Sequence, residues 1–259
     1  MTTSSWSSFA KYFELLSSPG RPSADDIAFV RNQLLSLNKP INGILLGVTK
    51  ELAKLASEEI NITAVDNSLE MIKHQWIGNS SNRTVILDDW LNLPSQFTSV
   101  DFVIGDGVFT VLDRKSSHLL MECVRAVLSD DGIFIVRLFC SPEMRESFEH
   151  IYHNTTNNLN AFEWRLAQSM CDSNFEVCMK NFLDRFKQVI SASDIEHFGW
   201  TKEQLSTIEP YANSPCTLTF MTETIFKELC KEHGMEIINR FTGSYELSER
   251  CPTFVLRKA

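Results

Sequence analysis

Long apolar runs are absent from this sequence. No stretch approaches the roughly 18 consecutive apolar residues that a membrane-spanning helix needs. The opening segment, MTTSSWSSFAKYFELL, also lacks the apolar core of a secretory signal peptide. We therefore expect a cytoplasmic protein without a membrane partner.

Paired cysteine motifs are missing as well. The seven cysteines include no CxxC pair, and such a set suits reduced thiols better than a disulfide framework or a zinc site. Glu146, Glu149, His150 and His153 fall at helical spacing, where a metal cluster is one interpretation and a solvated helix face is the other. We expect no bound metal.

Basic residues are scarce relative to acidic ones. Lys and Arg number 24 against 33 Asp and Glu, which gives a net charge of −9. Proteins that hold nucleic acid by its phosphates concentrate Lys and Arg, so we expect no nucleic-acid partner. The 259 residues are 43% hydrophobic and 22% charged, which is typical of a soluble globular protein with a sizeable core.

The stretch 43–66, GILLGVTKELAKLASEEINITAVD, reads as strand, tight turn, helix and strand. Its apolar run 43–48 has no alternation, which suits a parallel strand buried on both faces. Gly47 permits a sharp turn and a close approach of a ligand to the backbone, and Thr49 can cap the helix that follows. Asp66 closes the second strand, where an acid commonly binds the two hydroxyls of a ribose.

Three more strands are predicted further along the chain. Residues 83–87 form one that ends at Asp88, Asp89 and Trp90, where an acid and an indole could hold an adenine, or could equally be a helix cap and a core tryptophan. Residues 100–104 form another, which runs into Gly105, Asp106 and Gly107. Residues 133–139 form the fifth. Arg137 at its end could meet an anionic substrate or a structural acid.

These patterns predict the fold class: α/β, a Rossmann-like doubly wound sheet of five parallel strands in a single domain. We expect N-terminal helices over 1–39, including an amphipathic helix over 5–16, and a cofactor-binding core over 40–140. A helical, aromatic-rich lid or insertion is expected over 141–221, with a separate helical subdomain as the alternative. A helix over 222–233 and strands over 236–247 and 253–257 would complete the sheet as an antiparallel hairpin.

The ordered set of segments carries a family resemblance. GILLGVTKEL, ITAVDNS, VILDDWLNLP, VDFVIGDGVFTVL and LSDDGIFIVRLF, followed by the terminal helix and hairpin, resemble a class I S-adenosylmethionine-dependent methyltransferase. The match covers 43–139 in good order and 222–259 loosely. No single motif is specific, so the resemblance rests on the order and spacing of all of them.

The resemblance implies S-adenosylmethionine as cofactor and S-adenosylhomocysteine as product. It implies that Gly47, Val48 and Thr49 lie beside the methionine part of the cofactor. Asp66 would hold the ribose hydroxyls with Asn67 beside it. Asp89 would take the adenine amino group with Trp90 against the ring, and Asp88 competes for that role. Gly105 would offer a carbonyl to the methionine ammonium, with Asp106 and Gly107 facing the methyl group.

The first motif departs from the family pattern. Leu45 stands where the full motif has an acid. The full motif also has three glycines, of which this chain keeps Gly47. Arg21, in a glycine-proline break, is our hypothesis for a compensating partner of the methionine carboxylate, and a solvated arginine is the alternative.

Because the first motif is incomplete, a catalytically degenerate binding protein is the alternative to an enzyme. A nicotinamide-dependent oxidoreductase is disfavoured because its GxGxxG phosphate turn is missing.

Missing signatures narrow the methyl acceptor. GDGV follows the fourth strand where methyltransferases acting on base amino groups typically show D/N-P-P-aromatic. Pro215-Cys216 resembles the nucleophile motif of cytosine-5 enzymes but falls out of their order, and Cys216 is otherwise a small buried hydrophobe. We expect a small-molecule acceptor. The sequence identifies no catalytic residue, because the sulfonium activates the methyl group and a dedicated base is optional.

Overall fold

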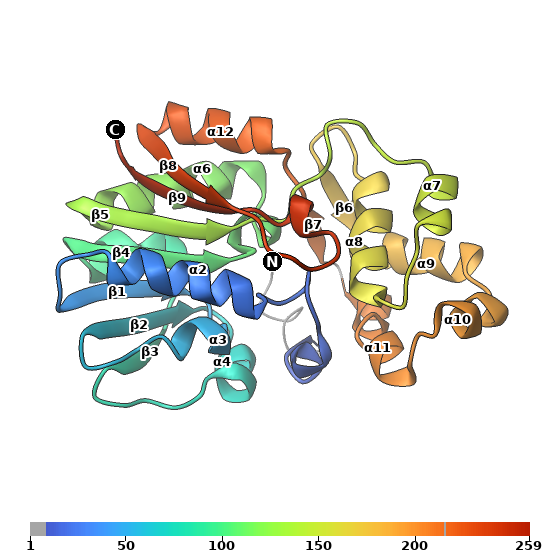
Figure 1. Ribbon diagram of the computed structural model, residues 1–259, viewed down its shortest axis with the longest axis horizontal. Coiled ribbons are helices and arrows are strands. Elements are labelled where there is room, and N and C mark those ends of the chain that lie inside the picture. The colour runs from blue at the N-terminus through green and yellow to red at the C-terminus, as the bar shows by residue number, and fades with distance from the viewer. Residues whose placement is uncertain (1–8, 215) are drawn as a thin grey trace.

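The computed structural model of the protein describes residues 9–214 and 216–259. Its main sheet has seven strands in the order β3-β2-β1-β4-β5-β9-β8 (Figure 1). Strands β1 to β5 are parallel, and β9 runs antiparallel to both β5 and β8. The predicted fold class is confirmed. The strands are β1 (Ile41–Leu46), β2 (Ile60–Asp66), β3 (Arg83–Leu87), β4 (Val100–Asp106), β5 (Leu128–Arg137), β8 (Met235–Phe241) and β9 (Thr253–Lys258).

The central strands are buried on both faces. Side chains alternate along a strand, so Ile44 and Leu46 of β1 join one core cluster while Ile41 and Leu45 join the other. All four are at most 1% exposed. This double burial is why the predicted strands read as unbroken apolar runs.

Helices cover the two faces of the sheet. One core cluster includes residues of α2 (Ala24–Leu35), α3 (Lys50–Ala53) and α4 (Leu69–Gln75). The other includes residues of α5 (Leu93–Gln96), α6 (Arg114–Val127) and α12 (Glu223–Glu232). Short 3₁₀ turns lie at η2 (Trp90–Asn92), η3 (Val108–Val111) and η5 (Ser248–Arg250). Among the described residues, no helix combines the length and the apolar character needed to cross a membrane.

The segment 141–221, called here the helical segment, lies beside the carboxyl ends of the strands (Figure 1). It packs around its own core cluster, which includes Phe162, Phe182 and Phe220. Its elements are α7 (Phe148–His153), α8 (Leu159–Ser169), β6 (Glu176–Cys178), α9 (Met179–Val189), α10 (Ala192–Phe198), α11 (Lys202–Ser206), η4 (Glu209–Asn213) and β7 (Thr217–Thr219).

Three predictions of secondary structure are wrong in detail. Residues 176–178 form strand β6, paired with β7, where we expected helix. The strand expected over 236–247 ends at Phe241, because the chain then turns into η5. The amphipathic helix expected over 5–16 lies partly outside the described residues; Phe9 is helical, residues 10–12 form a turn, and the 3₁₀ helix η1 (Phe13–Leu15) follows.

Candidate functional site

A cavity of about 370 Å³ opens at the carboxyl ends of the parallel strands. Its lining residues between Leu46 and Phe139 are called here the floor. The lining residues of the helical segment are called the roof: Asn160, Glu163, Trp164, Tyr211, Cys216 and Leu218. Phe9, Phe13, Leu16 and Gly20 of the N-terminal stretch complete the lining.

Nine of the twelve predicted cofactor residues line this cavity. Strands β1, β2, β3 and β4 bring them together, because the carboxyl ends of parallel strands meet at one edge of a sheet. Their contacts with a cofactor stay predictions. The nine are Gly47, Val48, Thr49, Asp66, Asn67, Asp89, Trp90, Asp106 and Gly107.

Gly47 makes the turn between β1 and α3. Its φ of +88° is a left-handed conformation that favours glycine, and its N–H donates to the carbonyl of Val65 at 2.8 Å. A Cβ built at this position would lie 3.8 Å from Asp66 Oδ2. Thr49 occupies the N-cap position of α3, but its side chain makes no capping hydrogen bond, and the helix itself is only four residues long.

Asp66 is the last residue of β2 and is 8% exposed. Its Oδ1 accepts a hydrogen bond from the Ser68 backbone N–H at 2.8 Å, at the start of α4. Burial raises the pKa of Asp66 to about 6, and the hydrogen bond from Ser68 partly opposes that rise. This carboxyl is therefore ionised at neutral pH, and it can accept hydrogen bonds from hydroxyl groups.

Asp89, rather than Asp88, is the acid on the cavity wall after β3. Asp89 Oδ1 accepts from the Leu91 N–H at 2.9 Å, and Oδ2 accepts from Asn67 Nδ2 at 3.2 Å. Asp88 Oδ1 instead accepts from Asn92 Nδ2 at 2.8 Å and does not line the cavity. Trp90 donates its indole N–H to the Val65 carbonyl at 2.7 Å, which fixes the ring near Gly47.

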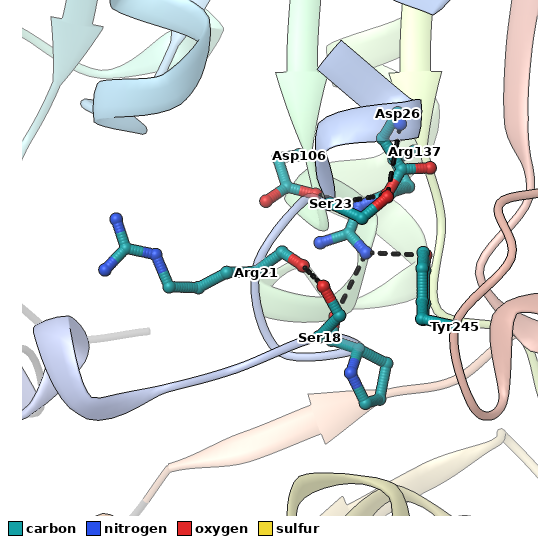
Figure 2. A network of polar contacts seen from close by, with 8 residues as sticks. Ser18, Arg21, Ser23, Asp26, Asp106, Arg137 and Tyr245 are labelled. Atoms are coloured by element: carbon teal, nitrogen blue, oxygen red, sulfur yellow. Dashed lines mark hydrogen bonds and ion pairs between the residues drawn. The ribbon is translucent and has the colours of Figure 1, made fainter. Parts of the chain in front are cut away.

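Asp106 and Arg137 form a buried ion pair at the ends of β4 and β5 (Figure 2). Arg137 Nε lies 2.6 Å from Asp106 Oδ1, and Arg137 NH1 donates to the Pro19 carbonyl and to the Tyr245 hydroxyl, each at 3.0 Å. Burial raises the pKa of Asp106, and the guanidinium opposes that rise. Of the two roles open for Arg137, the structure shows the partner of a structural acid.

Gly105 and Arg21 are not among the residues that line the cavity. Gly105 is paired within β4 and does not line the cavity, although a Cβ built on it would meet Val108 and Leu46, which do line it. Arg21 is 6% exposed, and its NH2 lies 2.7 Å from Glu51 Oε1, with Glu14 also nearby. Its guanidinium points away from the Asp106 pair (Figure 2) and is neither solvated nor part of the cavity lining.

Among the described residues, no group of three or more His, Cys, Asp and Glu side chains converges, so the metal-cluster interpretation of residues 146–153 finds no support there. Glu146 Oε2 lies 2.5 Å from Arg250 NH2, and His150 and His153 lie on the exposed side of α7. Pro215 lies outside the described residues. Burial raises the pKa of Cys216 to about 12, which disfavours a thiolate nucleophile.

Sequence reasoning missed the polar residues of the roof. Asn160, Glu163 and Trp164 share one face of α8, and Tyr211 comes from η4. The Tyr211 hydroxyl donates to Glu163 Oε1 at 2.6 Å, and Asn160 Nδ2 lies 3.4 Å from Glu163 Oε2. One signal was available in the sequence. The apolar residues of 159–167 fall on every side of the helix, which is typical of a buried helix, so Asn160 and Glu163 within it are buried too.

No protein-family model and no curated protein matches the sequence. Solved structures do resemble it. The CcbJ methyltransferase from Streptomyces caelestis superposes with a TM-score of 0.59 at 15% identity and covers 98% of each chain. A SAM-dependent methyltransferase from Methanosarcina mazei gives a TM-score of 0.55 at 13% identity and covers 88% of this chain and 96% of its own.

The chain has the fold of class I S-adenosylmethionine-dependent methyltransferases. A chain from Rhodobacter sphaeroides, named as a candidate Zn-dependent alcohol dehydrogenase, also superposes, with a TM-score of 0.68, 13% identity and coverage of 99% and 98%. At these identities the likeness shows the fold alone.

Proposed function

We propose that the protein is an S-adenosylmethionine-dependent methyltransferase acting on a small-molecule acceptor. The observation that carries the proposal is the shared cavity. The Gly47 turn, Asp66 and Asp89 line its floor, and residues of the helical segment line its roof. A concave site of this size suits a small acceptor better than a polymer.

The residues of the floor fit the cofactor. Asp66 keeps one carboxylate oxygen, Oδ2, for ribose hydroxyls while Oδ1 is held by Ser68. Gly47 leaves its backbone uncovered, and Asp89 offers an acidic group after β3. S-adenosylmethionine, when bound, supplies a methyl group that its sulfonium already activates. The work of this chain is then to orient the cofactor and acceptor and to keep water out.

A cofactor-binding protein without transfer activity is the second candidate. It is favoured by Leu45, which is fully buried in the core at the position of the family's acid and cannot contact an ammonium group. Turnover therefore has to be measured rather than assumed.

A transfer assay separates the two candidates. The protein is incubated with methyl-labelled S-adenosylmethionine and a protein-free metabolite extract, and label is followed into new small molecules. Wild-type protein is expected to form labelled product, and Asp66→Ala is expected to form none. Asp88→Ala is the matched control, because Asp88 is a neighbouring acid outside the cavity. Cofactor binding without labelled product from any acceptor would favour the second candidate.

A further inference from the structure

The charges on the cavity wall are all of one sign. Among the described lining residues, Asp66, Asp89, Asp106 and Glu163 carry carboxyl groups, and none is Lys, Arg or His. Such a lining attracts cations and repels anions, because the low-dielectric walls strengthen the interaction of each charge. A phosphate or carboxylate acceptor is therefore a poor fit to this cavity.

Glu163 is the most deeply buried acid in this lining that has no cation partner among the described residues. It is 2% exposed, and its contacts come from the Tyr211 hydroxyl and the Asn160 amide. Asp106, the other deeply buried acid of the lining, is neutralised by Arg137 at 2.6 Å. Buried charges are normally paired because removing an ion from water is costly, so Glu163 lacks the partner that its location calls for.

One carboxylate oxygen of Glu163, Oε2, accepts weaker hydrogen bonding than the other. Oε1 receives the short bond from Tyr211, whereas Oε2 has only the 3.4 Å contact with Asn160. Asn160 Oδ1 already accepts from the Ser17 backbone N–H at 3.0 Å, which turns the Asn160 amide group toward Glu163. A carboxylate has about four lone-pair sites, so Oε2 can accept a further donor.

Aromatic side chains surround the same space. Phe9, Phe13, Phe139, Trp164 and Tyr211 line the cavity. Phe9 and Tyr211 have ring centroids 4.7 Å apart, and Phe139 and Trp164 have centroids 5.2 Å apart. Aromatic faces attract cations as well as flat apolar groups. The Trp164 indole N–H is buried and has no hydrogen-bond partner in the described part of the chain.

On the basis of the function proposed above, we infer that the methyl acceptor is a small aromatic or apolar amine. Glu163 Oε2 binds its ammonium group and takes a proton from it, and the aromatic rings hold its body. Burial raises the pKa of Glu163 to about 7, which places the carboxyl in the range where a group can both take and release a proton near neutral pH.

The step balances in protons and electrons. The ammonium gives one proton to the Glu163 carboxylate and becomes a neutral amine, whose lone pair forms the bond to the methyl carbon. The carbon–sulfur bond of the methyl donor breaks, and its electron pair stays on sulfur. The products are a methylated ammonium and S-adenosylhomocysteine, and Glu163 returns its proton to solvent.

The test compares two amines with alcohols of the same shape. Binding of phenethylamine and 2-phenylethanol, and of tryptamine and tryptophol, is measured by calorimetry with and without saturating S-adenosylhomocysteine. We expect wild-type protein to prefer at least one amine over its alcohol by roughly tenfold or more. Glu163→Gln should lose the preference, and Glu163→Asp should keep part of it. Glu209→Gln, an exposed acid of the same segment, should leave it unchanged.

Equal binding of each amine and its alcohol, or a preference that survives in Glu163→Gln, would overturn the inference. Thermal unfolding of each variant shows whether it is folded. If Glu163→Gln does not fold, Glu163→Asp still tests the inference. Failure of S-adenosylhomocysteine to bind the wild type would instead overturn the proposed function. The amine preference measured without that ligand decides the inference separately.

Discussion

The floor and the roof of the cavity each contain a deeply buried acid, and the two acids are treated differently. Asp106 on the floor is balanced by Arg137 within the chain, so this pair is complete and structural. Glu163 in the roof has hydrogen bonds but no cation among its contacts with the described residues. The acid of the floor is neutralised within the chain, whereas the acid of the roof, in the inference above, is neutralised by the ammonium group of a ligand.

Breaking the complete pair should have the largest effect. Arg137→Met leaves Asp106 buried without its cation and also removes the hydrogen bonds to Pro19 and Tyr245. We expect a loss of about 3–5 kcal/mol in the free energy of unfolding, measured by urea denaturation. Asp106→Asn combined with Arg137→Met should recover part of the loss. Stability equal to wild type in the single variant would mean that the pair is not structural.

Glu163 should give a pH-dependent stability of its own. Its pKa is about 7 in the folded protein against an ordinary 4.5, so its contribution is complete below about pH 4.5 and is lost as the pH rises to about 7. Relative to Glu163→Gln, wild type should lose roughly 3 kcal/mol across this window. Burial holds the pKa values of the neighbouring Tyr211 and Cys216 above this range, so they do not contribute.

Unfolding midpoints of wild type, Glu163→Gln and Glu209→Gln between pH 4.5 and 8 measure this difference. Glu209→Gln should follow wild type at every pH. A constant gap between wild type and Glu163→Gln would show that Glu163 is not held in an unfavourable environment, and the contrast between floor and roof would disappear.

Asp66 should make cofactor affinity depend on pH. Its carboxylate accepts hydrogen bonds from the ribose in the proposed site, and burial raises its pKa to about 6. The affinity for S-adenosylhomocysteine should be flat above pH 7 and should fall by up to about tenfold per pH unit below 6. Calorimetry of Asp66→Asn should show weaker binding and no such fall. A flat profile in the wild type would place the ribose elsewhere.

The smallest effect is expected from a comparison of alanine substitutions at two glycines. Gly47 and Gly78 have φ values of +88° and +90°, so alanine at either should cost about 1–2 kcal/mol of stability through backbone strain. Only Gly47 lines the cavity. Gly47→Ala should therefore weaken S-adenosylhomocysteine binding beyond Gly78→Ala in the same titration, and equal affinities would remove the Gly47 turn from the site.

The floor was predictable because its signals are local. Strand β3 has the predicted bounds, since a short apolar run between turn residues is readable by itself. Gly105 does not line the cavity, because it is paired within β4 between β1 and β5, and that pairing is a non-local property of the sheet. Arg21 was misplaced because its partner Glu51 is set by tertiary packing, which no local pattern records.

The roof could not be predicted because its contacts are non-local. Glu163 and Tyr211 are 48 residues apart in sequence, and nothing in either helix marks the other as its partner. Strand β6 is three residues long, which is too short for a periodic pattern in the sequence. Its pairing with β7 defines it as a strand.

Titration of S-adenosylhomocysteine into wild type, Asp66→Ala and Asp88→Ala by calorimetry tests the central claim most directly. Asp66 lines the floor and Asp88 does not, although both are acids at neighbouring strand ends. Binding to wild type and Asp88→Ala, with a loss of roughly tenfold or more in Asp66→Ala, is the predicted result. No binding to the wild type, or equal binding to all three proteins, would contradict a cofactor site at this edge of the sheet.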